Sequence, residues 1–134
     1  MYQKTGKKST SHTIDWTTIE YSTTEQAVGT WTDGKTIYRR VINQNGTTGT
    51  ASYSTDTSIR MDTIVSLQAF YWYKTATGEQ AFVGPYYSSS TDYVRFFVRH
   101  YAQSGASDYI EARVGSGQSQ QTTFGFQYII EYTK

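Results

Sequence analysis

Apolar and polar residues alternate with a period of two in several segments of the chain, and this pattern constrains the fold more than any other feature. Segment 124–133 shows it most clearly, because every second residue from Phe124 to Tyr132 is aromatic or aliphatic. A period of two sends successive side chains to opposite faces of a β-strand. Segments 93–101 and 109–114 alternate in the same way. We therefore expect strands that bury one face and expose the other.

A tight turn is indicated by the sequence Thr32-Asp33-Gly34-Lys35. Asp-Gly supplies the positive φ angles of a type I′ turn, whose twist suits a β-hairpin with a loop of two residues. With such a loop, Thr32 pairs with Lys35, Trp31 faces Thr36 and Gly29 faces Tyr38. The sequence thus predicts a hairpin with strands near 28–32 and 35–43.

The remaining strand-like segments are shorter or have mixed patterning. They lie at 13–19, 50–53, 64–74 and 80–83, whereas 43–49, 84–92, 102–108 and 115–123 are typical of loops. Segment 64–74 carries aromatic residues on both faces, which indicates burial on both sides or a subunit contact. We predict an all-β fold: an antiparallel β-sandwich, jelly-roll-like, with about nine or ten strands.

Length, charge and residue usage exclude several classes of function. The 134 residues suit a single domain, predicted at 12–134 after a polar tail at 1–11. A net charge of +1 argues against a nucleic-acid partner, and no apolar run is long enough for membrane insertion. Without cysteine, and with His12 and His100 far apart, we expect no metal site and no cofactor. His100 falls on an apolar strand face, which predicts a hydrogen-bonded core histidine.

No motif for catalysis is present. Serines cluster in turn-like segments without a nucleophile elbow, and the glycines at 115 and 117 lack the rest of a phosphate-binding fingerprint. Glu111 and Glu131 are the pair of acids that we would examine for cleavage of a glycan. We predict that the protein has no catalytic residues and is not an enzyme.

After these exclusions, the remaining candidate function is non-covalent binding through surface residues. Tyrosine gives a large contact area at small entropic cost, and aromatic faces stack on sugar rings. The candidate ligand-binding residues are Tyr86, Tyr87, Trp72 and Tyr73, although core or subunit packing is an alternative for each. An outward row of Arg95, Phe97 and Arg99 is typical of an interface, where arginine and aromatic residues are enriched. This row predicts a homo-oligomer.

Segment 21–43, YSTTEQAVGTWTDGKTIYRRVIN, resembles the opening of the C-terminal domain in phage and prophage tail-fibre or head-fibre proteins. The matching residues are Tyr21, Ser22, Glu25, Val28, Gly29, Thr30, Trp31, Asp33, Gly34, Lys35, Ile37, Tyr38 and Arg39. The ending 130–134 resembles the closing strand of such domains, whereas 46–123 shows no resemblance. The resemblance implies a virion protein made in the bacterial cytoplasm, trimeric at a fibre tip, with other fibre or baseplate proteins as partners. Residues 1–11 would then mark the junction with a fibre shaft.

Three hypotheses follow. The leading one is a fibre head that binds a host-surface glycan as its receptor without catalysis, from the hairpin signature and the tyrosine-bearing loops. The second is a structural decoration or fibre-trimerisation domain with no ligand. The third is a glycan depolymerase acting through Glu111 or Glu131.

Overall fold

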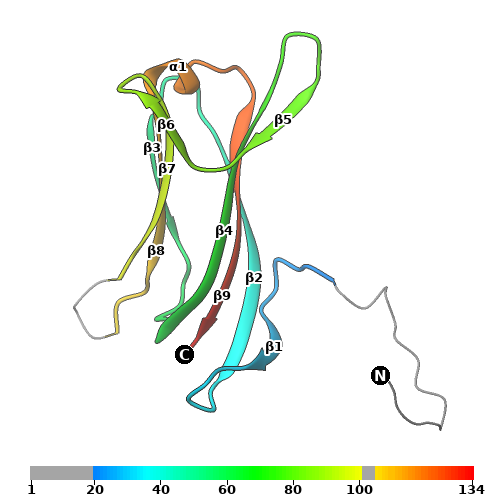
Figure 1. Ribbon diagram of the computed structural model, residues 1–134, viewed down its shortest axis with the longest axis vertical. Helices are drawn as coiled ribbons and strands as arrows, with labels where there is room; N and C mark the ends of the chain where they lie inside the picture. Colours follow the sequence, from blue (N-terminus) through cyan, green and yellow to red (C-terminus); the bar gives the residue numbers. More distant parts are fainter. Residues whose placement is uncertain (1–19, 101–104) are drawn as a thin grey trace, which may run out of the picture.

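The computed structural model describes residues 20–100 and 105–134. This part of the chain forms nine strands and one short helix (Figure 1). The elements are β1 (Gln26–Thr30), β2 (Thr36–Asn45), β3 (Ser52–Asp56), β4 (Thr63–Lys74), β5 (Gln80–Val83), β6 (Tyr86–Ser89), β7 (Asp92–Arg99), β8 (Tyr109–Val114), α1 (Ser116–Ser119) and β9 (Phe124–Thr133).

The strands form two antiparallel sheets that pack as a sandwich. One sheet has five strands in the order β1-β2-β9-β4-β5, and the other has four in the order β3-β8-β7-β6. The chain crosses between the sheets from β2 to β3, from β3 to β4, from β5 to β6 and from β8 to β9, which gives a jelly-roll-like winding. The predicted all-β, antiparallel sandwich is therefore confirmed.

The core lies between the sheets and is mainly aromatic. The inward residues of β9 are all buried, as the alternation predicted: Phe124, Phe126, Tyr128, Ile130 and Tyr132. From the opposite sheet, Phe96 meets the Phe126 ring edge-on at 6.0 Å between centroids, and Tyr53 lies at 4.8 Å from the same ring. Aromatic pairs at such distances add to the stability gained from buried area. The outward residues of each strand remain available for other contacts.

The Asp-Gly hairpin is confirmed, but its predicted register is wrong. Trp31 and Lys35 close the loop, with a hydrogen bond from Trp31 N to Lys35 O at 2.8 Å, and Gly29 pairs with Ile37. Gly34 alone in this turn has a positive φ, of 87°. A turn followed by one left-handed glycine makes a loop of three residues, so the pairing shifts by one from that of a type I′ hairpin.

Other differences from the predictions concern segments whose conformation depends on contacts with distant parts of the same chain. Segment 84–92 was predicted as a loop, yet it contains β6, which pairs with β7. Segment 115–123 contains α1. The prediction of a core histidine is also wrong, because the His100 side chain is 51% exposed and lies 2.8 Å from the buried Asp108 carboxylate. The tail at 1–11, His12 and the strand predicted at 13–19 lie outside the described residues.

Candidate functional site

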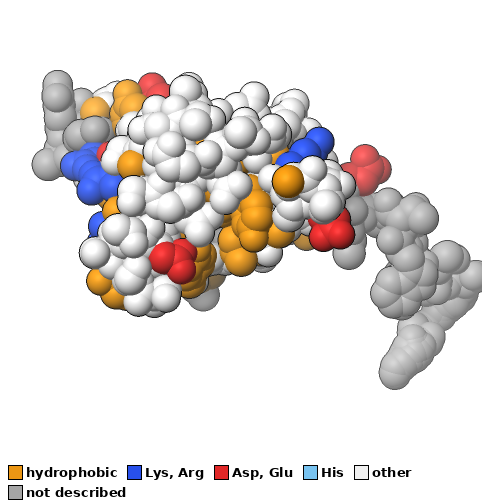
Figure 2. Space-filling model, turned by 90° about the horizontal axis from the view of Figure 1, so that it is seen from above, with side chains coloured by type: hydrophobic (Ala, Val, Ile, Leu, Met, Phe, Trp, Pro, Cys, Tyr) orange, Lys and Arg blue, Asp and Glu red, His pale blue; other side chains and the backbone are white. Residues whose placement is uncertain are grey.

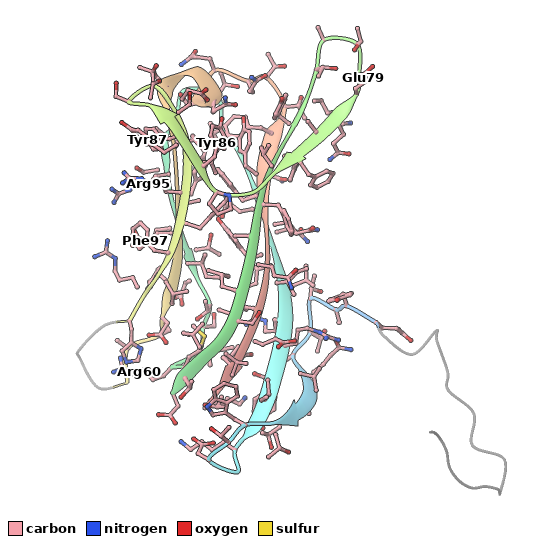
Figure 3. The ribbon with its side chains drawn as sticks, viewed as in Figure 1. Arg60, Glu79, Tyr86, Tyr87, Arg95 and Phe97 are labelled. Atoms are coloured by element: carbon pink, nitrogen blue, oxygen red, sulfur yellow. The ribbon has the colours of Figure 1, made fainter. Side chains whose placement is uncertain are left out.

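The outward side chains of β6, β7 and β8 form one flat surface, which we call the Tyr–Arg face. Alternation along β7 sends Val94, Phe96 and Val98 into the core and the residues between them outward. In Figure 3, Tyr87, Arg95 and Phe97 point away from the sandwich. The Tyr–Arg face consists of Tyr87, Tyr93, Arg95, Phe97, Arg99, Glu111 and Arg113.

One end of the Tyr–Arg face is an aromatic pair. Tyr87 and Tyr93 are directly opposite each other on β6 and β7, and their rings stack with 6.2 Å between centroids and 27° between planes. The Arg95 guanidinium lies over the Tyr93 ring, 5.0 Å from its centroid. Tyr87 is 70% exposed, the largest exposure among the large hydrophobic side chains described. The pair therefore presents an open aromatic platform on a rigid sheet.

Two arginines lie next to this platform. Arg95 on β7 is directly opposite Arg113 on β8, and directly opposite residues have Cβ atoms about 4.5–5.5 Å apart. Within residues 20–100 and 105–134, Arg95 makes no ion pair. Arg113 lies 3.7 Å from Glu111, and its side chain is 40% exposed. The centre of the face is therefore positively charged.

Glu111 is engaged by the arginines around it. Its Oε2 accepts a hydrogen bond from Arg99 Nε at 2.5 Å, and its Oε1 accepts one from Arg99 Nη2 at 3.2 Å. The hydrogen bonds from Arg99, followed by the positive charges of Arg99 and Arg113, lower the pKa of Glu111 despite its burial. Glu111 is thus held as an anion that neutralises Arg99.

Phe97 lies between two guanidinium groups. Arg113 and Arg99 are 5.6 Å and 5.9 Å from the centroid of its ring. Phe97 remains 37% exposed. The predicted interface row of Arg95, Phe97 and Arg99 therefore does share one face, together with Tyr87. Within this row, Arg99 already has a carboxylate partner on the same sheet, whereas Arg95 contacts the Tyr93 ring and makes no ion pair with any residue that the structure describes.

Tyr86 and Tyr73 belong to the interior. Tyr86 packs against the core, and its hydroxyl donates a hydrogen bond to Asp92 Oδ1 at 2.6 Å. Burial, with the Asp92 carboxylate beside it, raises the pKa of Tyr86 to about 12. Tyr73 packs against the core with its ring 5.6 Å from that of Tyr71. Figure 3 shows Tyr86 directed between the sheets while Tyr87 points outward.

Trp72 lies on the opposite side of the molecule. It pairs with Gly125 of β9 on the outer surface of the five-stranded sheet, where a Cβ on Gly125 would come within 2.8 Å of the Trp72 ring. Several neighbouring outward positions on β2, β4, β5 and β9 are also apolar, with the amides of Asn43, Gln68 and Gln127 between them. We call this surface the apolar face and define it as Val41, Phe70, Trp72, Phe82 and Ile129.

A charge pair borders the apolar face, and two strongly exposed rings, Tyr21 and Phe82, lie beside it or on it. Arg39 lies 3.6 Å from Glu131, and its guanidinium stacks on Tyr21 at 4.5 Å from the centroid. Phe82 is 54% exposed. Next to these residues, a shallow hollow is lined in part by Tyr21, Val41 and Ile129. These two charges are therefore compensated within the chain.

The four predicted ligand-binding residues are not brought together. Tyr87 lies on the Tyr–Arg face, Trp72 lies on the apolar face, and the other two lie between the sheets. The residues that sequence reasoning missed are Tyr93 and Arg113. Tyr93 belongs to the same outward row as Arg95, so the alternation alone placed it there, whereas Arg113 required the β7–β8 register.

The two acids considered for catalysis lie on opposite faces of the sandwich. Glu111 points outward from β8, and Glu131 points outward from β9 beside Arg39. They do not converge on one bond. In the described part of the chain, no group of three or more His, Asp or Glu side chains is arranged to hold a metal ion, and no helix is long and apolar enough to cross a membrane.

The end of the sandwich that carries α1 and the β4–β5 turn differs from both faces. Viewed from above, it exposes mostly uncharged polar atoms with some apolar side chains and a few charged ones (Figure 2).

The fold and this surface together define an antiparallel β-sandwich with an open aromatic and cationic face. No protein-family model matches the chain, and neither the curated proteins nor the solved structures contain a significant match.

Proposed function

We propose that this protein is the head domain of a phage virion fibre and binds a host-surface glycan through the Tyr–Arg face, without catalysis. The observation that carries the proposal is the stacked pair of Tyr87 and Tyr93, with Tyr87 70% exposed. An aromatic platform of this kind stacks on the apolar face of a sugar ring. Because the platform stands on two paired strands, little freedom is lost when a ligand binds.

The state of the two acids supports binding rather than bond cleavage. A general acid in glycoside hydrolysis needs a raised pKa and a second carboxylate across the scissile bond. Glu111 instead has a lowered pKa because Arg99 donates hydrogen bonds to it. Glu131 lies on the other side of the sandwich. These features favour the non-catalytic proposal over a depolymerase.

The placement in a virion fibre rests on the resemblance of segments 21–43 and 130–134. These two segments pack against each other. Glu25 accepts hydrogen bonds from the Tyr132 hydroxyl at 2.5 Å and from Lys134 at 2.7 Å. Tyr38 contacts Tyr132 with 6.1 Å between ring centroids. The resembling residues thus form one structural unit at the β1–β2–β9 side of the molecule.

Binding of the purified protein to immobilised glycans and to host cells tests the proposal. Tyr87→Ala should weaken binding at least about tenfold, because it removes the exposed ring of the platform. Val28→Ala is the control, since Val28 is also an exposed apolar residue but belongs to neither the Tyr–Arg face nor the apolar face. Absence of binding to any glycan, or unchanged binding by Tyr87→Ala, would contradict the proposal.

A second candidate function, assembly of the fibre head, is favoured by the apolar face. The charge pair that borders it, Arg39 with Glu131, is closed within the chain, so a second copy could pack over the apolar face without burying either of these charges alone. We propose this face as the contact between copies in a homo-oligomer, expected to be a trimer. The two functions use different faces and are compatible.

A further inference from the structure

We infer that the glycan recognised by the Tyr–Arg face is acidic, and that Arg95 and Arg113 bind the carboxylate of a pyranose stacked on Tyr87. This inference rests on the proposed function and names the class of ligand for the same site. It is carried by the juxtaposition of two arginines with an aromatic platform, rather than by either feature alone.

The first step is the position of the two arginines. Arg95 and Arg113 are directly opposite on adjacent strands, and like charges in this position destabilise a sheet. Arg95 has no ion-pair partner in the described part of the chain. The Arg95 guanidinium lies over Tyr93 and the Arg113 guanidinium lies near Phe97 and Glu111, so an anion toward which both side chains turn would relieve this repulsion. Such an anion would also receive charge-assisted hydrogen bonds, which are the stronger kind.

The second step is the charge balance of the face. Three arginines and one glutamate leave the Tyr–Arg face with a net charge of +2, and the next outward-facing acid on this sheet, Asp56 of β3, lies at the Arg99 end. Glu111 is committed to Arg99 through two hydrogen bonds, so it compensates the Arg95 end of the face only weakly. The excess positive charge is therefore concentrated next to the tyrosine pair.

The third step distinguishes a sugar carboxylate from other anions. The Arg95 guanidinium is stacked on Tyr93, which in turn stacks on Tyr87, so the positive charge lies directly beside the aromatic platform. A pyranose with a carboxylate matches both parts, because its ring covers the tyrosine while its anion reaches the arginines. A linear polyol phosphate carries the charge but has no ring for the platform. A glycan that contains a carboxylated pyranose is thus the fitting ligand class, and a uronic-acid oligomer is the probe for it.

Oligogalacturonate and its methyl ester are matched probes, because esterification removes the charge and leaves the sugar rings. Titration calorimetry on the intact protein should show oligogalacturonate binding at least about tenfold more tightly than the ester. Equal binding of both would overturn this inference while leaving the proposed function in place. If the protein bound neither probe and no glycan on an array, the proposed function would be overturned as well. Tighter binding of polyglycerol phosphate than of oligogalacturonate would also overturn the inference, in favour of a phosphate ligand.

Single substitutions test whether Arg95 and Arg113 bind the sugar carboxylate. Arg95→Gln and Arg113→Gln should each weaken binding of oligogalacturonate about tenfold and leave binding of the ester unchanged. Lys74→Gln, an exposed cation at the end of β4, is the control and should have no effect. Thermal midpoints of both arginine variants are measured alongside, so that a loss of binding is not mistaken for a loss of folding. Wild-type affinity for oligogalacturonate in both variants would overturn the inference.

Discussion

The two outer faces of this sandwich are built by the same rule but have opposite chemistry. On each sheet, alternation buries every second residue and leaves the others outward. On β6, β7 and β8 the outward residues include tyrosines and arginines with an excess of positive charge. On β2, β4, β5 and β9 the outward residues are aliphatic and aromatic side chains mixed with uncharged amides such as Asn43, Gln68 and Gln127, beside a closed charge pair. Alternation therefore determines which residues face outward, whereas the side-chain chemistry of those residues determines what each face can bind.

The largest effect is expected from a charge in the middle of the apolar face. Ile129→Glu places a carboxylate on β9 between Val41 and Gln68. If copies pack through this face, the buried charge should weaken self-association at least about a hundredfold. Analytical ultracentrifugation measures this directly.

Phe97→Ala is the control for that experiment, because Phe97 occupies the Tyr–Arg face. It should leave the oligomer intact. If Phe97→Ala dissociates the oligomer and Ile129→Glu does not, the interface lies on the four-stranded sheet, as the outward row of Arg95, Phe97 and Arg99 predicted from sequence.

Gly125→Ala should have the next largest effect. A Cβ at this position would lie 2.7 Å from Gln44 O and 2.8 Å from the Trp72 ring, so the strands or the ring must shift. Overpacking of this kind costs about 1–3 kcal/mol, which chemical denaturation resolves. Gly84→Ala is the control, since no atom lies within 4 Å of its Cβ position. Equal stability of the two variants would mean that Trp72 is not packed over β9.

The smallest effect concerns acid stability on the Tyr–Arg face. The pKa of Glu111 is lowered in the folded state, mainly by hydrogen bonds from Arg99, so its stabilising contribution is present above the ordinary value of 4.5. That contribution is lost as pH falls from this value through the folded-state pKa. Glu111→Gln should therefore reduce the fall in thermal midpoint between pH 7 and pH 3 by a few degrees. An unchanged fall would show that Arg99 does not hold the carboxylate.

The same substitution should act in the opposite direction on ligand binding. Removing the Glu111 charge makes the Tyr–Arg face more positive, so affinity for oligogalacturonate should rise a few-fold at low salt. Calorimetry at two salt concentrations tests this. A loss of affinity would indicate that Glu111 itself contacts the sugar.

The fold was predictable where the signal was local. Segment 124–133 forms β9 with the predicted bounds. Its large apolar residues alternate, and a strand is the conformation that buries all of them on one side. Strand β6 was missed because Gly84-Pro85 and the serines after Tyr87 are typical of turns, and only pairing with β7 makes the segment extended. The hairpin register depended on the single left-handed residue Gly34, which dipeptide preference does not specify.

The site was predictable in part for the same reason. The outward row on β7 followed from alternation, so Arg95 and Phe97 were placed on one face in advance. Whether Tyr86 or Tyr87 faces outward depended on the strand character of β6, which the sequence did not reveal. The opposition of Arg95 and Arg113 depended on the β7–β8 register, a long-range property set by the connection between those strands.

The position of β9 has a consequence for how the protein acquires its fold. Strands β2 and β4 each pair with β9, and they belong to one sheet only because β9 lies between them. The pairing of Val41 with Ile129 joins residues far apart in the chain, so the entropy of closing a long loop must be overcome before the sheet gains stability. Folding should accordingly be slow and cooperative, on a timescale of roughly milliseconds to seconds, with insertion of β9 as the committing step.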